Sequence, residues 1–153
     1  MEGRRKMITS DDIRDEIIDD EGEVLAVYLC SAGHKTCGVG HLILREDPEY
    51  DLAVGDAITE DRCRELLDRD LDTTIAECEK LLPQFATLPL AVQKILANMM
   101  YNIGRPRLSL FKKCLAAIET GDWPTVANEM QDSLWARQLP NRSGRLISRM
   151  RAV

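Results

Sequence analysis

The chain has 153 residues, 44% of them hydrophobic and 5% aromatic, and a formal net charge of -6 at pH 7. This length suffices for one sizeable core, or for two small lobes that share a helix, and no apolar run reaches the roughly 18 residues of a membrane-spanning helix. The five cysteines, which lack regular spacing, are typical of reduced thiols and argue against the disulfide framework of a secreted protein.

The charge is divided unevenly along the chain. Residues 1–82 hold 10 Lys and Arg against 22 Asp and Glu, whereas residues 83–153 hold 10 against 4. The two halves therefore carry charges of -12 and +6. A basic half on an acidic protein is typical of a face for an anionic polymer, but mutual attraction of two lobes explains the division equally well.

The N-terminal part predicts a short helix that is not preceded by an export signal. Arg4, Arg5 and Lys6 are basic, but an acidic, helix-like sequence follows them where a signal peptide would have an apolar region. We therefore expect the protein to accumulate in a cytoplasm. Cap residues and first-turn acids begin the helix at residues 9–12, and it is expected to end near Gly22.

A β-hairpin is predicted after this helix. Residues 24–30 alternate in side-chain character, which is typical of a half-buried strand. A turn at residues 31–35 and a second strand at residues 36–41 are expected to follow, and residues 42–44 to add a third short strand.

The alternation also assigns side chains to the two faces of the hairpin. Placing Cys30 opposite Thr36 puts both on one face, because successive side chains of a strand point to opposite sides. The other face is expected to lie on a core, and it carries Leu25, Leu29, Cys37, Val39 and His41. Glu21 comes just before the hairpin, so Glu21, Cys30 and Thr36 are predicted to meet in one groove.

The remainder of the chain is predicted to be a surface loop followed only by helices. The loop covers residues 45–57, and an uninterrupted helix from Glu60 to Leu82 then has apolar residues at steps of three and four, with Thr59 as its N-cap. This long helix is expected to join two lobes. Four more helices are expected to begin at or directly after Pro89, Ser109, Asp122 and Pro140, and Gly104 and Gly121 to end the first two.

Five features spread along the chain are specific in combination, although each is weak singly. They are Asp20-Glu21-Gly22, the hairpin with Thr36, Gly-Val-Gly-His at residues 38–41, the long helix, and Pro-Asn-Arg at residues 140–142. Together they resemble the phage lysozymes, the muramidase endolysins of glycoside hydrolase family 24. The resemblance extends from about Ile13 to Arg149.

The resemblance implies an α+β, lysozyme-like fold with a small β-sheet lobe and an all-helical lobe, which a long helix joins around a cleft for peptidoglycan. We expect a single domain over residues 1–153, with residues 1–72 as the N-terminal helix and sheet lobe and residues 73–153 as the helical lobe. The implied reaction is hydrolysis of the β-1,4 bond between N-acetylmuramic acid and N-acetylglucosamine, which leads to lysis of the host cell.

The resemblance also implies roles for the residues of the groove. In the family a glutamate at the position of Glu21 is the general acid, an aspartate at the position of Cys30 assists the attacking water, and a threonine at the position of Thr36 orients it. This chain departs from the family at Cys30. A Cys30 thiolate could accept a proton from the water, giving inversion, or attack the anomeric carbon, giving retention; we favour the water route because the family's site implies it. The thiol would need a lowered pKa, for which His34 and Lys35 could supply positive charge.

Further residues are implied to support the site or to bind substrate. Arg142 would hold Glu21, and His41 and Asp70 would form a structural ion pair between the sheet lobe and the long helix, which would raise the pKa of His41. Cleft positions of the family align with Leu42, Tyr101, Cys114 and Glu129. The tyrosine can stack on a sugar, whereas the last two depart from the usual polar residues.

Two other interpretations compete with a glycosidase. One is a zinc site, because Cys30, His34, Cys37 and His41 have the ligand types that zinc accepts. Their spacing is unlike that of a usual zinc finger, and the strand phase turns Cys30 away from the last two. The other is a lysozyme-like module that lost its activity with the aspartate and now only binds glycan.

The expected partners follow from the resemblance. Bacterial peptidoglycan is the expected substrate, and a separate pore-forming protein is expected to release the enzyme from the host cytoplasm to the cell wall. We expect a monomer without cofactor, metal ion, nucleic-acid partner or stable membrane association.

Overall fold

The computed structural model describes residues 7–153, so the basic residues 4–6 lie outside the described part of the chain. The described residues form seven α-helices, two 3-10 helices and one three-stranded antiparallel sheet, which confirms the predicted α+β class. They divide into two compact units, residues 10–73, here called the sheet unit, and residues 7–9 with 74–153, here called the helical unit. None of the described helices is long and apolar enough to cross a membrane.

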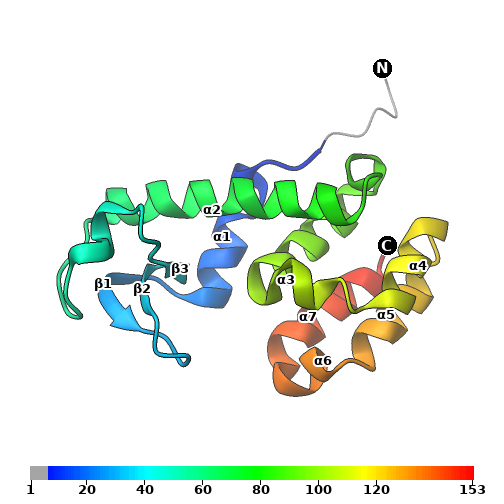
Figure 1. Ribbon diagram of the computed structural model, residues 1–153. Helices are drawn as coiled ribbons and strands as arrows, with labels where there is room; N and C mark the ends of the chain where they lie inside the picture. Colours follow the sequence, from blue (N-terminus) through cyan, green and yellow to red (C-terminus); the bar gives the residue numbers. More distant parts are fainter. Residues whose placement is uncertain (1–6) are drawn as a thin grey trace. The chain divides into compact units, whose positions relative to one another are not determined.

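The sheet unit begins with helix α1 (Ser10–Glu21), as predicted (Figure 1). Asp11 and Asp12 occupy its first turn, where acidic side chains interact favourably with the helix dipole. Ile13 and Ile17 are buried on its apolar side. The helix ends before a glycine, and the chain then enters the sheet.

The sheet consists of β1 (Val24–Leu29), β2 (Lys35–Gly38) and β3 (His41–Leu42) in that order. Tyr28 of β1 lies opposite Thr36, so the predicted pairing of Cys30 with Thr36 is wrong. The turn is tighter than expected, because the N–H of Cys30 donates to the carbonyl of His34 at 2.9 Å. The partner of Thr36 moves by two residues, and side chains two apart share a face, so Cys30 and Thr36 still lie on the same side.

The predicted second strand is interrupted. Gly38 and Gly40 have positive φ values of 60° and 68°, and they turn the chain between β2 and β3. A Cβ built on Gly38 would lie 3.2 Å from both Cβ and Sγ of Cys63 in helix α2, so a larger residue would crowd Cys63 at this close approach. The predicted third strand is present, although it is His41–Leu42 and not residues 42–44.

The core of the sheet unit takes in less of β1 than the alternation predicted. One core cluster contains Val27, Cys37, Ile43, Ile58, Cys63 and Leu66. Leu25 and Leu29, which were expected there, are 42% and 55% exposed. A register irregularity between Val24 and Tyr28 leaves the middle of β1 as the part that reaches the core. The loop after β3 is present as expected and contains the 3-10 helix η1 (Pro48–Asp51).

Helix α2 (Glu60–Leu81) agrees with the predicted long helix, and residues on both sides of the unit boundary belong to it. Thr59 caps it, since its Oγ1 accepts the N–H of Arg62 at 3.1 Å. Ion pairs fasten α2 to the rest of the sheet unit: Arg14–Asp68 at 2.8 Å, Arg62–Glu49 at 2.8 Å and Arg64–Glu23 at 2.8 Å.

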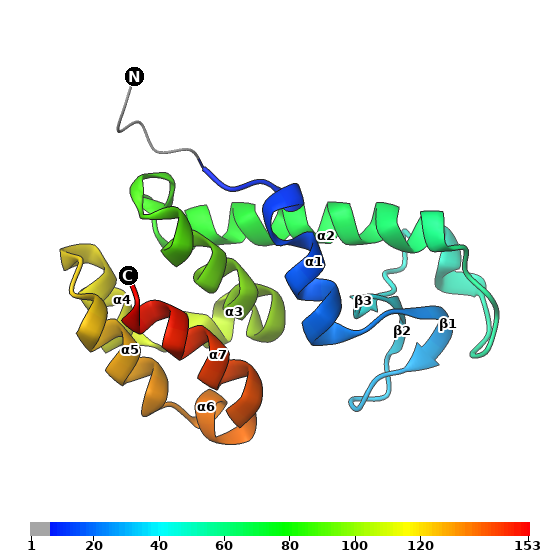
Figure 2. The same ribbon diagram turned by 180° about the vertical axis from the view of Figure 1, so that it is seen from behind.

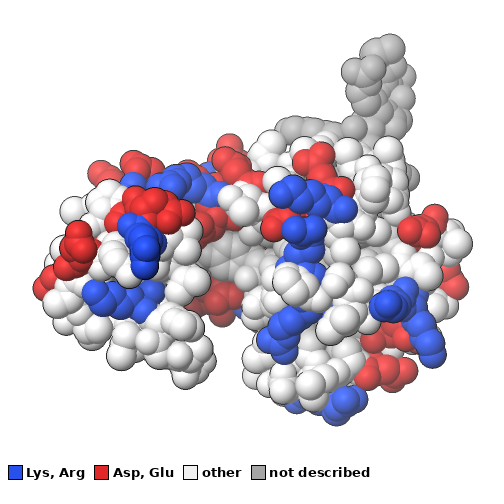
Figure 3. All heavy atoms as spheres, in the orientation of Figure 1, with Lys and Arg blue, Asp and Glu red and all other residues white. Residues whose placement is uncertain are grey.

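The elements of residues 82–153 are all helical, as predicted. They are η2 (Phe85–Thr87), α3 (Leu90–Leu108), α4 (Lys112–Thr120), α5 (Trp123–Gln131), α6 (Leu134–Gln138) and α7 (Pro140–Arg151). Helix α7 packs against α3, α5 and α6, and it is seen best from the side shown in Figure 2. On the face shown in Figure 3, basic side chains of the helical unit form separate groups, and acidic side chains lie beside several of them.

Three boundaries in the helical unit differ from the predictions. Gly104, with φ 80° and ψ 163°, interrupts α3 as expected, but a further helical stretch follows it to Leu108. Helix α4 begins at Lys112 and not at Ser109. Helix α6 was not predicted, because its five residues are too few to display a periodic pattern.

Candidate active site

Glu21 ends helix α1 beside the turn between β2 and β3. Gly22, with a φ of 76°, redirects the chain directly after it. A Cβ built on Gly40 would lie 3.5 Å from Oε1 of Glu21, so this turn comes close to the carboxylate. The pKa of Tyr28 is raised by burial and, in second place, by the charge of Glu21. The carboxylate is therefore close to the sheet, and its predicted meeting with Cys30 and Thr36 in one groove stays a prediction.

Cys30 follows β1 and has a partly exposed thiol. The pKa of this thiol lies below its ordinary value, because the backbone N–H groups of His34 and Ala32 are directed at the sulfur. Slight burial acts in the opposite direction, and hydrogen bonds from Thr36 and the Gly33 backbone lower the pKa further. Successive N–H groups of a tight turn form a concave site that favours an anion, here the thiolate.

The predicted source of this lowering was wrong, since backbone dipoles and not side-chain charges are responsible. The ammonium of Lys35 is directed elsewhere, because its Nζ donates to the carbonyl oxygens of Leu52 at 2.6 Å and Tyr50 at 3.3 Å. Sequence reasoning could not find the N–H groups, because they point at the sulfur only when the turn has its observed length.

Thr36 lies in the middle of the sheet, opposite Tyr28 on β1 and Leu42 on β3. Its side chain is buried, and Oγ1 donates to the carbonyl of His34 at 2.9 Å. A hydroxyl carries one proton, so it serves either this carbonyl or the sulfur of Cys30 at a given moment. Tyr28 was missed by sequence reasoning, although it precedes Cys30 by two residues and was therefore in the same phase.

His41 of β3 is buried and contacts two aspartates, and these residues are here called the His41 cluster. Its Nδ1 lies 2.6 Å from Oδ2 of Asp70, and its Nε2 lies 2.8 Å from Oδ2 of Asp47. Burial alone would lower the pKa of His41, but hydrogen bonds to the two aspartates raise it above its ordinary value. Asp47, which sequence reasoning missed, also accepts the N–H of Leu44 at 2.8 Å. This bond and the one to His41 outweigh burial, so the pKa of Asp47 lies below its ordinary value.

The other predicted residues belong to the helical unit. Arg142 on α7 is buried, and its Nε donates to Oδ1 of Asn98 at 2.9 Å. The role of Arg142 in holding Glu21 stays a prediction. Tyr101 is half-buried on α3.

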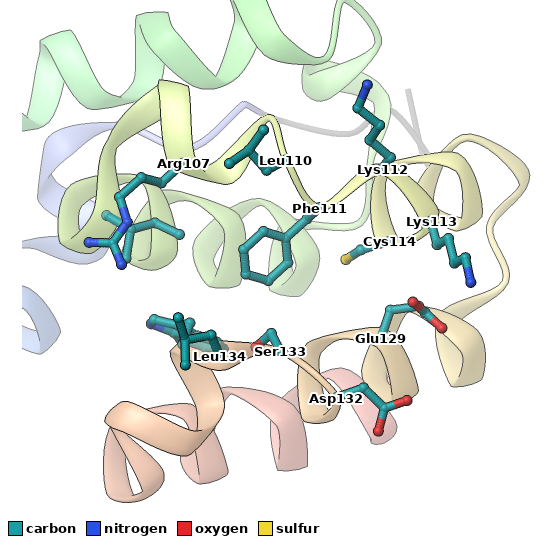
Figure 4. A pocket seen from close by; sticks show the side chains of 12 residues that line it. Arg107, Leu110, Phe111, Lys112, Lys113, Cys114, Glu129, Asp132, Ser133 and Leu134 are labelled. Carbon is teal, nitrogen blue, oxygen red and sulfur yellow. The ribbon is translucent and has the colours of Figure 1, made fainter.

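Cys114 and Glu129 line a pocket of about 570 Å³ between the end of α3 and helices α4, α5 and α6 (Figure 4). Its apolar part includes Phe111 and Trp135, whose rings meet edge to face with centroids 6.5 Å apart. Burial, together with the charge of Glu129, raises the pKa of Cys114 to about 12. Cys114 is therefore a neutral thiol. Tyr101 does not line this pocket.

The zinc interpretation is not supported by the geometry. Among residues 7–153, no three His, Cys, Asp or Glu side chains are grouped so that they could hold a metal ion. Cys37 is buried in the core of the sheet unit, and both ring nitrogens of His41 contact aspartates. Neither side chain is therefore placed to bind a metal ion together with Cys30.

The sheet unit thus contains groups with complementary chemistry. The carboxyl group of Glu21 can donate a proton. The thiol of Cys30 has a lowered pKa, and its thiolate form can accept a proton, while the hydroxyl of Thr36 can position water. A proton donor and a proton acceptor are the two groups that hydrolysis of a glycosidic bond requires.

Comparison with known proteins agrees with this chemistry. The family model described as phage lysozyme matches residues 19–152. The chain is 31% identical over 156 residues to probable T4-type lysozyme 1 of Dictyostelium discoideum, and 30% identical over 155 residues to probable T4-type lysozyme 2 of the same organism. Both alignments cover 89% of this chain and 91% of the relative. The chain is also 31% identical over 146 residues to the pre-baseplate central spike protein Gp5 of Enterobacteria phage T4, of which it covers 25%.

Proposed function

Because the chain belongs to the phage lysozyme family, we propose that it is an endolysin that hydrolyses the β-1,4 bond between N-acetylmuramic acid and N-acetylglucosamine in bacterial peptidoglycan. Family membership supports a lysozyme-like muramidase, which is a glycoside hydrolase. The observation that carries the proposal for this chain is the lowered pKa of Cys30, beside Thr36, in the unit that also holds Glu21.

The proposed reaction uses Glu21 as the general acid. Its proton goes to the glycosidic oxygen as the bond to the anomeric carbon breaks, and the leaving sugar departs with a neutral hydroxyl. The position of Glu21 at the end of α1, close to the turn between β2 and β3, supports this role.

Cys30 is proposed to take the place of the family's aspartate. Its thiolate accepts a proton from a water molecule that Thr36 positions, and the resulting hydroxide attacks the anomeric carbon on the face opposite the leaving group. The configuration is then inverted. Direct attack by the sulfur would give a covalent intermediate and retention, so the configuration of the first product distinguishes the two routes.

Substrate contacts are proposed for residues of both units. In the sheet unit, the exposed Leu42 lies next to Thr36 and offers an apolar surface to a sugar ring. In the helical unit, Tyr101, Cys114 and Glu129 are proposed to contact the substrate, and the pocket that contains the last two is large enough for part of a peptide or a sugar. Arg142 and the His41 cluster are proposed to support the site.

The biological role proposed here is lysis of a host cell. The enzyme would remain in the host cytoplasm until a separate pore-forming protein releases it to the cell wall. It would act as a monomer, with peptidoglycan as its partner.

The chemistry of the newly formed chain ends tests the proposed function. Purified peptidoglycan is incubated with the protein, the new reducing ends are reduced with borohydride, and the hydrolysed sugars are identified. A muramidase exposes N-acetylmuramic acid, so reduced muramic acid is expected. If the protein sediments with peptidoglycan but exposes no reducing ends, the chain is the glycan-binding module considered above and not an enzyme.

A further inference from the structure

A second pocket lies in the sheet unit, on the side of β3 and η1. It has a volume of about 660 Å³, and its lining includes His34, Leu42, Leu44, Arg45, Tyr50 and Asp51. We propose that this pocket, here called the sheet pocket, binds a sugar residue that carries a carboxylate, such as N-acetylmuramic acid, as a subsite separate from the reacting groups. The inference rests on the proposed function, because it takes its ligand from the same polymer.

The first observation is a set of apolar side chains that line the pocket and are exposed to solvent. Leu42, Leu44 and Tyr50 are 48%, 43% and 43% exposed. When a ligand covers apolar side chains that were exposed to water, the removal of their surface from water favours binding. The face of a sugar ring, with its C–H groups, packs well on an aromatic ring, and the phenol hydroxyl can hydrogen-bond at its edge.

The second observation is a set of polar groups without partners. Within residues 7–153, the side chains of Arg45, His34 and Asp51, which are exposed, make no hydrogen bond or ion pair. By contrast, Arg62 and Arg64 of the same unit pair with glutamates. The contrast is informative because residues 10–73 hold 19 Asp and Glu against 6 Lys and Arg, so acidic partners are abundant.

The third observation is that the wall bearing Tyr50 is held in place before any ligand arrives. Lys35 on β2 donates to the carbonyl oxygens of Tyr50 and Leu52, and Glu49 forms two hydrogen bonds with Arg62 of α2, at 2.8 and 3.0 Å. The backbone carbonyl of Asp47 also accepts the N–H of Tyr50 at 3.0 Å. A pre-formed wall lowers the entropy lost on binding.

These observations define the ligand. The guanidinium of Arg45 can form two parallel hydrogen bonds with a carboxylate, a geometry for which arginine is suited better than lysine. Asp51 can accept hydrogen bonds from sugar hydroxyls, and the ring can rest on Tyr50. A neutral sugar would use the apolar side chains and Asp51 but not Arg45, so the sheet pocket should prefer an acidic sugar to a neutral one.

Binding experiments with the hydrolysis-deficient Glu21→Gln protein test the proposal. The probes are a peptide-free tetrasaccharide of alternating N-acetylglucosamine and N-acetylmuramic acid, and neutral chitotetraose of the same length. Amide shifts of His34, Arg45, Tyr50 and Asp51 are followed by NMR during each titration. We expect these amides to shift with the acidic probe, and Arg45→Gln to weaken its binding about tenfold with little effect on chitotetraose.

Arg69→Gln provides the matched control. Arg69 is an exposed arginine of the same unit that does not line the pocket, so its substitution changes the net charge equally. Equal weakening by the two substitutions would reduce the effect to overall charge and overturn the proposal. Amides of the sheet pocket that stay unshifted, in a protein whose unsubstituted form cleaves peptidoglycan, would also overturn it without affecting the proposed function. Selective binding by a protein that cleaves nothing would support the sheet pocket and refute the enzyme.

Discussion

At the scale of single residues, Cys30 stands where the resemblance to the phage lysozymes implies an aspartate. The replacement retains a group that can accept a proton, because the tight turn directs N–H groups at the sulfur and lowers its pKa. The other four cysteines are buried, and burial raises the pKa of their thiols, to about 12 for Cys37, Cys78 and Cys114. One reactive thiol is therefore expected among five.

This difference leads to a prediction for Cys30. Near neutral pH, iodoacetamide should modify Cys30 alone and abolish lysis, which mass spectrometry and a clearing assay can follow in parallel. Cys30→Ala should take up no label and should clear peptidoglycan about 100-fold more slowly. Cys30→Asp should be active with an optimum at lower pH, since the pKa of an ordinary aspartate is about 3.9. If Cys30→Ala clears as fast as the parent, Glu21 and Thr36 suffice and the cysteine is a bystander.

The His41 cluster predicts how stability depends on pH. The pKa of His41 is raised in the folded state, so its contribution is complete below the unfolded value of about 6.5 and is lost as pH rises through the folded value. The pKa of Asp47 is lowered, so its contribution is complete above about 3.9 and is lost as pH falls through the folded value. The cluster therefore stabilises the fold most between these limits.

Asp47→Asn and Asp70→Asn should lower the free energy of unfolding by about 1 to 3 kcal/mol near pH 5.5, because each removes one partner of the buried imidazole. The loss should shrink at pH 9, because raising the pH favours the neutral imidazole, which the aspartates attract less strongly. Thermal unfolding at the two pH values measures this. Asp72→Asn, at an exposed position of α2, the helix that also contains Asp70, is the control. A loss that is the same at both pH values, or no larger than that of the control, would remove the cluster's electrostatic role.

At the scale of elements, the hairpin shows how far the sequence could be interpreted. The alternation predicted correctly that Cys30 and Thr36 share a face, since this depends only on the period of two. The register depended on the length of the turn, which residues 31–35 did not reveal. The predicted pairing was therefore shifted by two residues, and Tyr28 was not recognised as the partner of Thr36.

The interruption of the second strand has a physical cause that no single-sequence pattern contains. Gly38 is favoured by its close approach to Cys63, which is 25 positions away in the sequence and belongs to α2. Asp47 was missed for the same reason, since only the fold brings it to His41. Local patterns predicted Glu21, Cys30 and Thr36 because helix ends and strand phases are local. Contacts between distant elements cannot be predicted from local patterns.

Gly38 therefore provides a prediction for the packing of β2 on α2. Gly38→Ala should destabilise the protein by about 1 to 3 kcal/mol, because the new Cβ combines a positive φ with a contact of 3.2 Å to Cys63. Gly22→Ala has a similar φ, but its Cβ would meet nothing within 4 Å, so it reports backbone strain alone. The midpoint of chemical denaturation should fall further for Gly38→Ala. Equal midpoints would mean that Cys63 and α2 move aside for the new Cβ without a loss of stability.

At the scale of the whole molecule, the composition and the combined motifs predicted the fold class and the family, because these depend on features spread over the entire chain. The division of charge has a structural counterpart in the sheet unit, where arginines of α1 and α2 pair with aspartates and glutamates. The sequence did not reveal these pairs, since each joins residues of different elements. They reduce the mutual repulsion of an acidic unit.

The central claim is that Glu21 donates the proton that breaks the glycosidic bond, and its replacement tests this most directly. Glu21→Gln preserves the shape of the side chain and removes its proton, whereas Asp19→Asn makes the same kind of change at an exposed position of the same helix. The measurement is the initial rate at which a suspension of purified peptidoglycan clears, for proteins with matching circular dichroism spectra. We predict that Glu21→Gln lowers this rate at least about 100-fold while Asp19→Asn leaves it unchanged. Clearing by Glu21→Gln at the rate of the unsubstituted protein would contradict the assignment of the catalytic acid.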